Sequence, residues 1–139
     1  MKVLIIGSGG REHAIALKIK ASPLVTKIYC APGNGGIAEI AECIDIKVDD
    51  IEQLLYFAIT EKIGLTIVGP EIPLVQGIVD VFNLRGLRIF GPSKLAAQLE
   101  GSKVFAKEFL EKFNIPTAKF QVFTEKNSAI AYVHQIGVP

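Results

Sequence analysis

Short apolar runs alternate with longer amphipathic stretches along the first ninety residues. The runs favour buried strands because parallel sheets cover both faces of each strand. Strands are predicted at Lys2–Ile6, Thr26–Cys30, Leu65–Val68 and Leu87–Phe90. Apolar residues at helical spacing predict helices over Arg11–Lys20, Asp50–Glu61 and Leu74–Leu84. This alternation predicts βαβ units and a doubly wound, Rossmann-like α/β fold with a parallel sheet.

Two segments of this first region are less regular. Ala31–Gly36, with the sequence APGNGG, is rich in turn residues and predicts a loop. Ile44–Val48 is either a third short strand or an extended approach to the next helix. At that helix start, Asp50 is expected to cap free backbone N–H groups, with Gln53 at the reciprocal capping-box position.

The pattern changes after Gly91, and we place a domain boundary near Gly101, giving domains 1–101 and 102–139. Ser93–Leu99 is expected to form a short helix. Lys119–Phe123 alternates like a half-exposed strand.

The second domain is expected to carry two helices. Ser102 would cap the first, whose phenylalanines recur every four residues on one face, at Phe105, Phe109 and Phe113. Asn114 to Pro116 would stop it, and Thr124 would cap the last helix, toward Gln135.

Composition narrows the class of protein. The chain has 139 residues, 50% of them hydrophobic and 21% charged, which is enough to bury a core. A net charge of +1 gives no electrostatic footprint for nucleic acid or a membrane surface. No apolar run approaches the roughly 20 residues of a membrane span, so a cytoplasmic protein is expected. Cys30 and Cys43 have no metal-ligand spacing and are interpreted as buried, reduced thiols.

Three loops follow predicted strands and would meet at one edge of the sheet: GSGGRE from Gly7, GPEIP from Gly69 and GPS from Gly91. Ligands of open α/β sheets bind at the carboxyl ends of the strands. We therefore expect the chemistry of this protein at these loops.

The turn from Gly7 to Glu12 follows a strand and opens a helix. Glycines let a ligand approach the backbone, and a helix start suits phosphate. A dinucleotide site is the obvious interpretation, but Glu12 replaces the small third residue of that fingerprint and Cys30 to Pro32 offers no ribose-binding acid. Arg11 favours a phosphate monoester, and Glu12 would accept hydrogen bonds from hydroxyls or an amine. Alternatively, both are a solvated helical turn.

Glu71 stands between Pro70 and Pro73, which restrict the backbone and hold the carboxylate in place. Such a carboxylate at the sheet edge suits ribose hydroxyls, although a helix dipole alone would also favour a Glu there. For Asn34, we prefer a left-handed turn over ligand contact.

Five collinear blocks cover nearly the whole chain and together resemble phosphoribosylamine–glycine ligases, the glycinamide ribonucleotide synthetases of the ATP-grasp family. The blocks are MKVLIIGSGGREHAIALKI, APGNGG, GPEIPLVQGIVD, GLRIFGPSKLAAQLEGSKVFAKEFL and NIPTA. The resemblance implies a sheet domain that binds substrate, followed by the opening of an ATP-grasp domain. It also implies ATP-dependent joining of glycine to phosphoribosylamine, with magnesium or manganese bridging the ATP phosphates.

The resemblance also implies site residues. A sugar-phosphate pocket would be lined by Gly9, Gly10, Arg11, Glu12 and Glu71, with Asn34 as a further candidate. Lys103, in EGSK, matches a lysine that reaches ATP phosphate in such enzymes. Without the resemblance it would be interpreted as a solvated lysine on an amphipathic helix.

The glycine-rich loop and acidic metal ligands of the family are absent, so we expect an amino-terminal fragment that is inactive alone and holds no metal. Two other functions are weighed. One is a nicotinamide-dependent oxidoreductase, opposed by Glu12 and the missing ribose acid. The other is a stand-alone phosphosugar-binding module, which would require this chain to be a whole natural protein.

Overall fold

The computed structural model describes residues 1–137, and the chain divides into two compact units. The first is Met1–Gly101 and the second begins at Ser102. Within residues 1–137, no helix combines the length and the apolar character needed to cross a bilayer.

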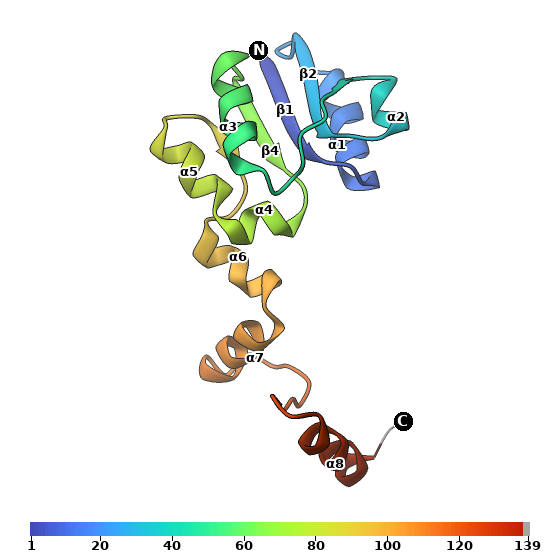
Figure 1. The fold of residues 1–139 in the computed structure, drawn as a ribbon, viewed down its shortest axis with the longest axis vertical. Coiled ribbons are helices and arrows are strands. Elements are labelled where there is room, and N and C mark those ends of the chain that lie inside the picture. Colours follow the sequence, from blue (N-terminus) through green and yellow to red (C-terminus); the bar gives the residue numbers. More distant parts are fainter. Residues whose placement is uncertain (138–139) are drawn as a thin grey trace. The chain divides into compact units, whose positions relative to one another are not determined.

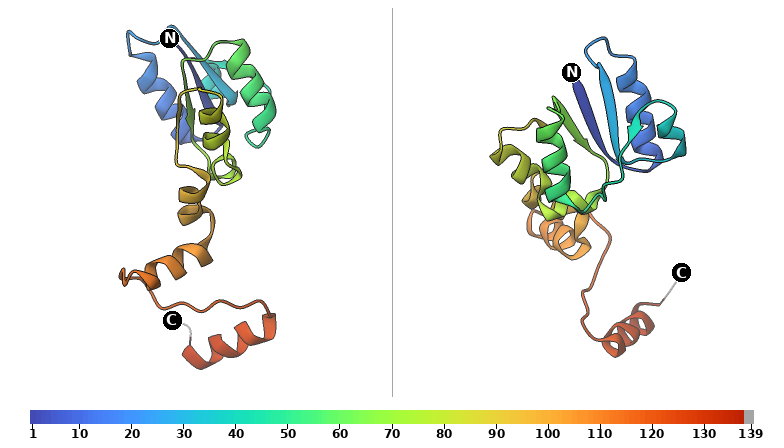
Figure 2. Two further views of the ribbon diagram at one scale, coloured as in Figure 1. Left: turned by 90° about the vertical axis from the view of Figure 1, so that its left-hand side faces the viewer. Right: turned by 45° about the horizontal axis from the view of Figure 1, so that its top comes forward.

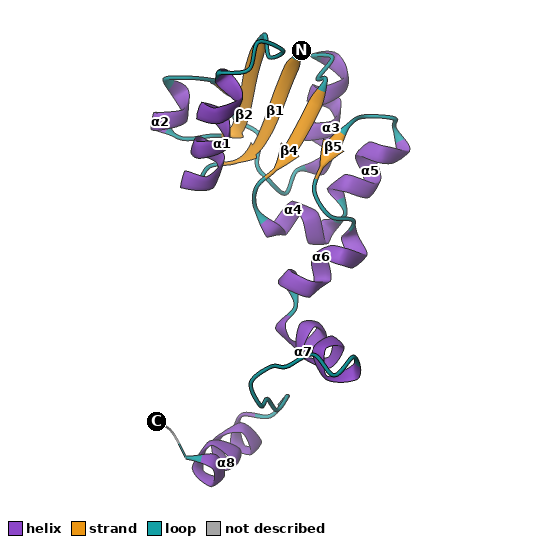
Figure 3. Cartoon of the chain, turned by 180° about the vertical axis from the view of Figure 1, so that it is seen from behind, coloured by secondary structure: helices purple, strands orange, loops and turns teal. Residues whose placement is uncertain are grey.

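The first unit is built on a five-stranded parallel sheet in the order β3-β2-β1-β4-β5. Its strands are β1 (Lys2–Gly7), β2 (Lys27–Pro32), β3 (Glu42–Cys43), β4 (Leu65–Val68) and β5 (Ile89–Phe90). The first strand lies in the middle, between β2 and β4 (Figures 1 and 3). The order therefore reverses at β1, which confirms the predicted doubly wound α/β fold.

Helices cover both faces of the sheet (Figure 2). On one face, α1 (Gly10–Lys20) and α2 (Gly35–Ala38) pack against the cluster that contains Val3 and Ile5. On the other, α3 (Ile51–Thr60), α4 (Glu71–Gln76), α5 (Ile78–Leu84) and α6 (Lys94–Gly101) contribute to the larger core cluster, which contains Leu4 and Ile6. Alternate residues of β1 thus face opposite helical layers, as the period of a strand requires.

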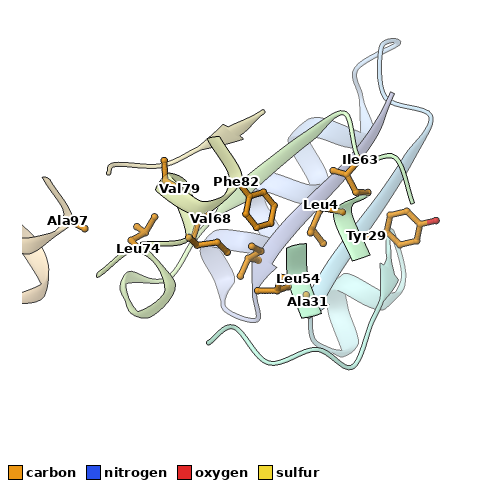
Figure 4. Packing of buried hydrophobic residues seen from close by; sticks show 13 residues of the cluster. Leu4, Tyr29, Ala31, Leu54, Ile63, Val68, Leu74, Val79, Phe82 and Ala97 are labelled. Carbon is orange, nitrogen blue, oxygen red and sulfur yellow. The ribbon is translucent and has the colours of Figure 1, made fainter. Parts of the chain in front are cut away.

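The larger core cluster is centred on fully buried apolar side chains (Figure 4). The ring of Phe82, from α5, lies in one cluster with Leu4 from β1, Leu54 from α3 and Val68 from β4. Each of these elements contributes apolar side chains to the same cluster. Exposing this face of β1 to solvent would therefore disrupt the packing of all of them.

The helix predicted over Leu74–Leu84 is wrong in its start and its continuity. Helix α4 already begins at Glu71, and Gly77 ends it with a φ of 99°. Helix α5 then starts at Ile78. A left-handed residue cannot continue a right-handed helix, and glycine adopts that conformation without a Cβ clash.

Of the two alternatives for Ile44–Val48, the strand is wrong, because the third strand is Glu42–Cys43, and the segment leads without regular structure to α3. Only one bond of the following segment continues toward β2, from Ile44 N to Cys30 O at 2.9 Å. The loop predicted over Ala31–Gly36 contains the end of β2 and the start of α2.

The cap of α3 is confirmed. The Asp50 carboxylate accepts a bond from Gln53 N at 3.1 Å. The reciprocal half of the capping box is not formed, since the Gln53 side-chain amide donates to the same carboxylate and Asp50 N donates to Lys47 O.

The second unit contains α7 (Lys103–Lys112) and α8 (Lys126–Ile136). Ser102 caps α7 as predicted, accepting from Phe105 N at 3.2 Å, and the rings of Phe105, Phe109 and Phe113 follow one another along one face. Lys119–Phe123 is not a strand, because no described residue of this unit forms a ladder beside it. The residue before α8 is Glu125, so the prediction of Thr124 as its cap is wrong.

At the amino-terminal edge of the sheet, Lys2 Nζ lies 2.7 Å from Glu61 Oε2, and the Tyr29 hydroxyl donates to the same oxygen at 2.9 Å. These contacts, Lys2 first, hold the pKa of the Glu61 carboxyl below its usual value of 4.5. A depressed pKa in the folded state contributes stability above the unfolded pKa, and this is lost as the pH falls through the folded value.

The variant Glu61→Gln should therefore be less sensitive to acid than the natural chain. Between about pH 7 and about pH 3, its urea midpoint should fall less than that of the wild type, because it has no such carboxylate to protonate. Glu52→Gln, an exposed residue of α3, serves as the matched control. Equal acid sensitivity in Glu61→Gln and wild type would show that the contact does not influence stability.

Candidate functional site

The loops after β1, β2 and β4 are tied together at the carboxyl edge of the sheet. Gly33 N donates to Gly7 O at 3.1 Å, and Gly69 N donates to Ile6 O at 3.0 Å. The buried Cys30 thiol also donates to Gly7 O, at 3.3 Å, and burial raises the pKa of that thiol to about 12. The end of β1 is thus anchored from both neighbouring strands.

Glu12 lies inside this edge, with only 4% of the residue exposed. Its Oε2 accepts a hydrogen bond from Gly9 N at 2.6 Å. The side chain fills space beside Gly7, Gly9 and Gly69, where added methyl groups would stand within 3 Å of its atoms. A side chain at any of these three positions would require the Glu12 side chain to shift.

Arg11 and Glu71 are brought together from the two loops that flank the end of β1. Arg11 Nη2 lies 3.6 Å from Glu71 Oε1, with 66% and 45% of the two side chains exposed. The pKa of the Glu71 carboxyl is lowered, first by a hydrogen bond from its own backbone N–H and then by the Arg11 charge. The site therefore presents a cation and a carboxylate side by side, both accessible to a ligand.

Asn34 holds the neighbouring loop in place. Its Nδ2 donates to Ser8 O at 2.7 Å, and its Oδ1 accepts from Ile37 N at 2.9 Å as the cap of α2. The left-handed turn preferred for Asn34 is wrong, since its φ is −152°. Gly33 adopts that conformation instead, with a φ of 76°, as expected for a residue without a Cβ.

The start of α1 provides anion-binding groups. The first N–H groups of a helix have no intrahelical acceptor and carry a partial positive charge. Gly9 N is occupied by Glu12, so the N–H groups of Gly10 and Arg11 remain, and nothing lies within 4 Å of a Cβ built on Gly10. Together with the Arg11 guanidinium, these groups can bind a phosphate monoester.

Lys103 lies in the second unit, as the first residue of α7. With Lys107, Phe120 and Phe123 it lines a groove of about 340 Å³. Within residues 1–137, no three His, Cys, Asp or Glu residues are grouped so that they could hold a metal ion. The proposed role of Lys103 toward ATP phosphate remains a prediction.

Two features of the site were missed by reasoning from the sequence. The first is the pairing of Glu12 with Gly69, residues 57 positions apart by the numbering. The second is the close approach of His13 to the first turn of α2, where a methyl group on Gly36 would stand 2.9 Å from the imidazole Cε1. A glycine placed where a strand ends is a usable signal, because it marks space that another side chain can occupy.

Residues 1–100 match the family described as "Phosphoribosylglycinamide synthetase, N domain". The whole chain is 55% identical to 33% of the phosphoribosylamine–glycine ligase of Caldanaerobacter subterraneus subsp. tengcongensis. It is 57% identical, over 141 aligned residues, to 33% of the enzyme of that name from Escherichia coli O6:H1. The chain thus spans about a third of the length of the curated relatives it matches.

The chain also resembles part of the length of several solved structures. A phosphoribosylamine–glycine ligase from Thermotoga maritima has a TM-score of 0.69 and 28% identity, over 97% of this chain and 30% of that one. An N5-carboxyaminoimidazole ribonucleotide synthetase from the same organism has a TM-score of 0.72 and 23% identity, over 99% of this chain and 37% of that one, which shows a shared fold. From the match over residues 1–100 and these relatives, the chain belongs to the phosphoribosylglycinamide synthetase N-domain family.

Proposed function

We propose that residues 1–101 form the phosphoribosylamine-binding domain of a ligase that joins glycine to phosphoribosylamine with ATP. The observation that carries this proposal is the meeting of Arg11 and Glu71, 3.6 Å apart, beside the open start of α1. The names of the relatives, at 55% and 57% identity, support the same reaction.

Each group has a chemical task in this proposal. The Gly10 and Arg11 N–H groups and the Arg11 guanidinium bind the 5′-phosphate, because hydrogen bonds to a charged acceptor are the strongest of their kind. Glu71, ionised at neutral pH, accepts hydrogen bonds from ribose hydroxyls. Asn34 positions the Ser8 carbonyl at the rim of the site.

In the proposed reaction the carboxylate of glycine attacks the γ-phosphorus of ATP, which releases ADP and gives an acyl phosphate. The amine of phosphoribosylamine then attacks the acyl carbon and displaces inorganic phosphate, giving glycinamide ribonucleotide. Residues 1–101 would bind and orient the amine-bearing sugar, which lowers the barrier by proximity. Residues 102–139 are proposed to be the beginning of an ATP-binding domain, in which Lys103 contacts a phosphate of ATP.

The geometry gives no support to a dinucleotide site. Strand β2 ends at Pro32, without an acidic side chain to hold an adenosine ribose. Glu12 occupies the space beside Gly69 at the end of β4, and its carboxylate uses the Gly9 N–H that a pyrophosphate would need.

Isothermal titration calorimetry with ribose 5-phosphate and with NAD tests the proposal. We expect heat of binding with ribose 5-phosphate, which carries the monoester and the hydroxyls that Arg11 and Glu71 would recognise, and none with NAD at the same concentration. Heat of binding with NAD and none with ribose 5-phosphate would contradict the proposal and favour a dinucleotide site.

Replacing Arg11 with Ala should weaken the binding of ribose 5-phosphate by about 1.5–3 kcal/mol, or roughly 10- to 150-fold, because a charge-assisted contact is lost. The fold should persist, since this side chain is exposed. Arg85→Ala removes an equally permanent charge from an exposed position after α5 and should leave affinity unchanged. If Arg11→Ala and the wild type bind ribose 5-phosphate with the same affinity, Arg11 is a solvent-exposed helix residue without a role in binding.

A further inference from the structure

We infer that Glu12 is a positioning residue of the proposed sugar-phosphate site. Its buried carboxylate joins the turn after β1 to the loop after β4, and so sets the spacing between Arg11 and Glu71. This inference rests on the proposed function. In this inference Glu12 supports the loops that bind the ligand and does not contact the ligand itself.

The first argument is accessibility. Glu12 is 4% exposed, and its Oε1 is fully buried with no donor among the described protein groups. Its Oε2 is held 2.6 Å from Gly9 N. Oε1 is therefore closed to a hydroxyl or amine of a bound sugar, and Oε2 is already engaged by the glycine turn.

The second argument is the fit of the surrounding backbone. An added methyl group on Gly7 would stand 2.6 Å from Glu12 Cγ, and one on Gly69 would stand 2.7 Å from the same atom. At Gly9 it would stand 2.9 Å from Oε2. Since real Cβ atoms do not approach other heavy atoms so closely, three glycines from two loops form one cavity shaped around this side chain.

The third argument connects this contact to the exposed pair. Arg11 and Glu12 are consecutive on α1, so their side chains diverge by about 100° around the helix. Fixing Glu12 inward therefore fixes Arg11 outward. Glu12 also packs against Gly69, which lies two residues before Glu71. The positions of Arg11 and Glu71, 3.6 Å apart, therefore both depend on the buried Glu12 side chain.

Length and charge of the side chain separate positioning from direct contact. Glu12→Gln keeps an oxygen at the same reach for Gly9 N–H, whereas Glu12→Asp keeps the charge but is one methylene too short. If Glu12 is a positioning residue, substrate binding should survive the change to Gln and be lost with Asp. If its charge binds the ligand, binding should survive the change to Asp and be lost with Gln.

The experiment uses the natural full-length protein and measures KM for phosphoribosylamine, ATP and glycine in the wild type, Glu12→Gln, Glu12→Asp and Glu12→Ala. For Asp and Ala, we expect KM for phosphoribosylamine to rise by about tenfold or more, with the other two KM values unchanged, since only the sugar site loses its geometry. For Gln we expect a change of no more than about threefold. Glu52→Ala, an exposed first-turn residue of α3, is the control.

Other outcomes would overturn the inference. A normal KM with Asp, or a loss with Gln as large as with Ala at an unchanged melting temperature, would make Glu12 a ligand contact. A fall in kcat alone, with every KM unchanged, would mean that Glu12 acts only in the transition state and does not position the bound sugar.

Hydrogen exchange at the Gly9 amide gives a readout independent of catalysis. The wild type and Glu12→Gln should show a slowly exchanging Gly9 N–H, and Glu12→Asp should show a fast one. Fast exchange in the wild type would contradict the contact itself. Slow exchange in a wild type that binds no ribose phosphate would leave the contact intact and refute the proposed function instead.

Discussion

Replacing Phe82 with Ala should lower the free energy of unfolding by about 3–5 kcal/mol, the largest loss expected from any single side chain described here. Phe82 is fully buried and lies in one core cluster with Leu4, Leu54 and Val68, which come from three other elements. Its removal takes away apolar burial and leaves a cavity that the sheet and α3 cannot close. Urea denaturation followed by circular dichroism measures the change.

Two variants sharpen this prediction. Phe82→Leu, which keeps most of the volume, should lose much less than Phe82→Ala. Leu84→Ala removes a side chain of the same helix that is 85% exposed, and should be nearly neutral. A loss of under about 1 kcal/mol for Phe82→Ala would mean that α5 does not close the core in the way described.

Replacing Gly33 with Ala is expected to cost about 2–5 kcal/mol, because two separate penalties combine. Gly33 has a φ of 76°, a conformation that costs a residue with a Cβ roughly 1–2 kcal/mol. The new methyl group would also overlap the thiol of Cys43, and overpacking of this kind typically costs about 1–3 kcal/mol. Chemical denaturation of the 139-residue chain provides the measurement.

The two penalties can be separated by a double-mutant cycle. Cys43→Ala should relieve the overlap in a Gly33→Ala background and leave the backbone strain, so the two substitutions should be strongly non-additive. Gly35→Ala is the matched control, since nothing lies within 4 Å of its added methyl group. Additive costs for Gly33→Ala and Cys43→Ala would show that the overlap is absorbed elsewhere in the loop.

The central sheet could be predicted from the sequence because its signal is local. Runs such as Leu65–Val68 consist of β-branched and apolar residues, and the structure has a strand there as predicted. Shorter edge strands carry too few residues to show a pattern, so β3 at Glu42–Cys43 could not be predicted. Lys119–Phe123 has the alternation of a strand, but a strand forms only beside a partner, and alternation does not reveal whether one is present.

The candidate site was predictable in outline. Glycine turns after strands indicate the sheet edge, and the sequence predicts both Arg11 and Glu71 as site residues, which lie 3.6 Å apart in the structure. The sequence could not show which charged side chain points inward. Arg11 and Glu12 are adjacent and equally polar, and only the three-dimensional meeting of Gly7 with Gly69 leaves a space for one of them.

The position of β1 in the sheet has a consequence for synthesis on the ribosome. It leaves the exit tunnel before the other four strands of this sheet, yet its Val3 pairs with Leu65 of β4. At about 5–20 residues per second, the second neighbour follows roughly 3–12 seconds later. During that interval one side of the apolar β1 segment has no partner, and Phe82, which covers one of its faces, is not yet made. The amino-terminal strand is therefore among the last to be fully enclosed, although it is the first to be translated.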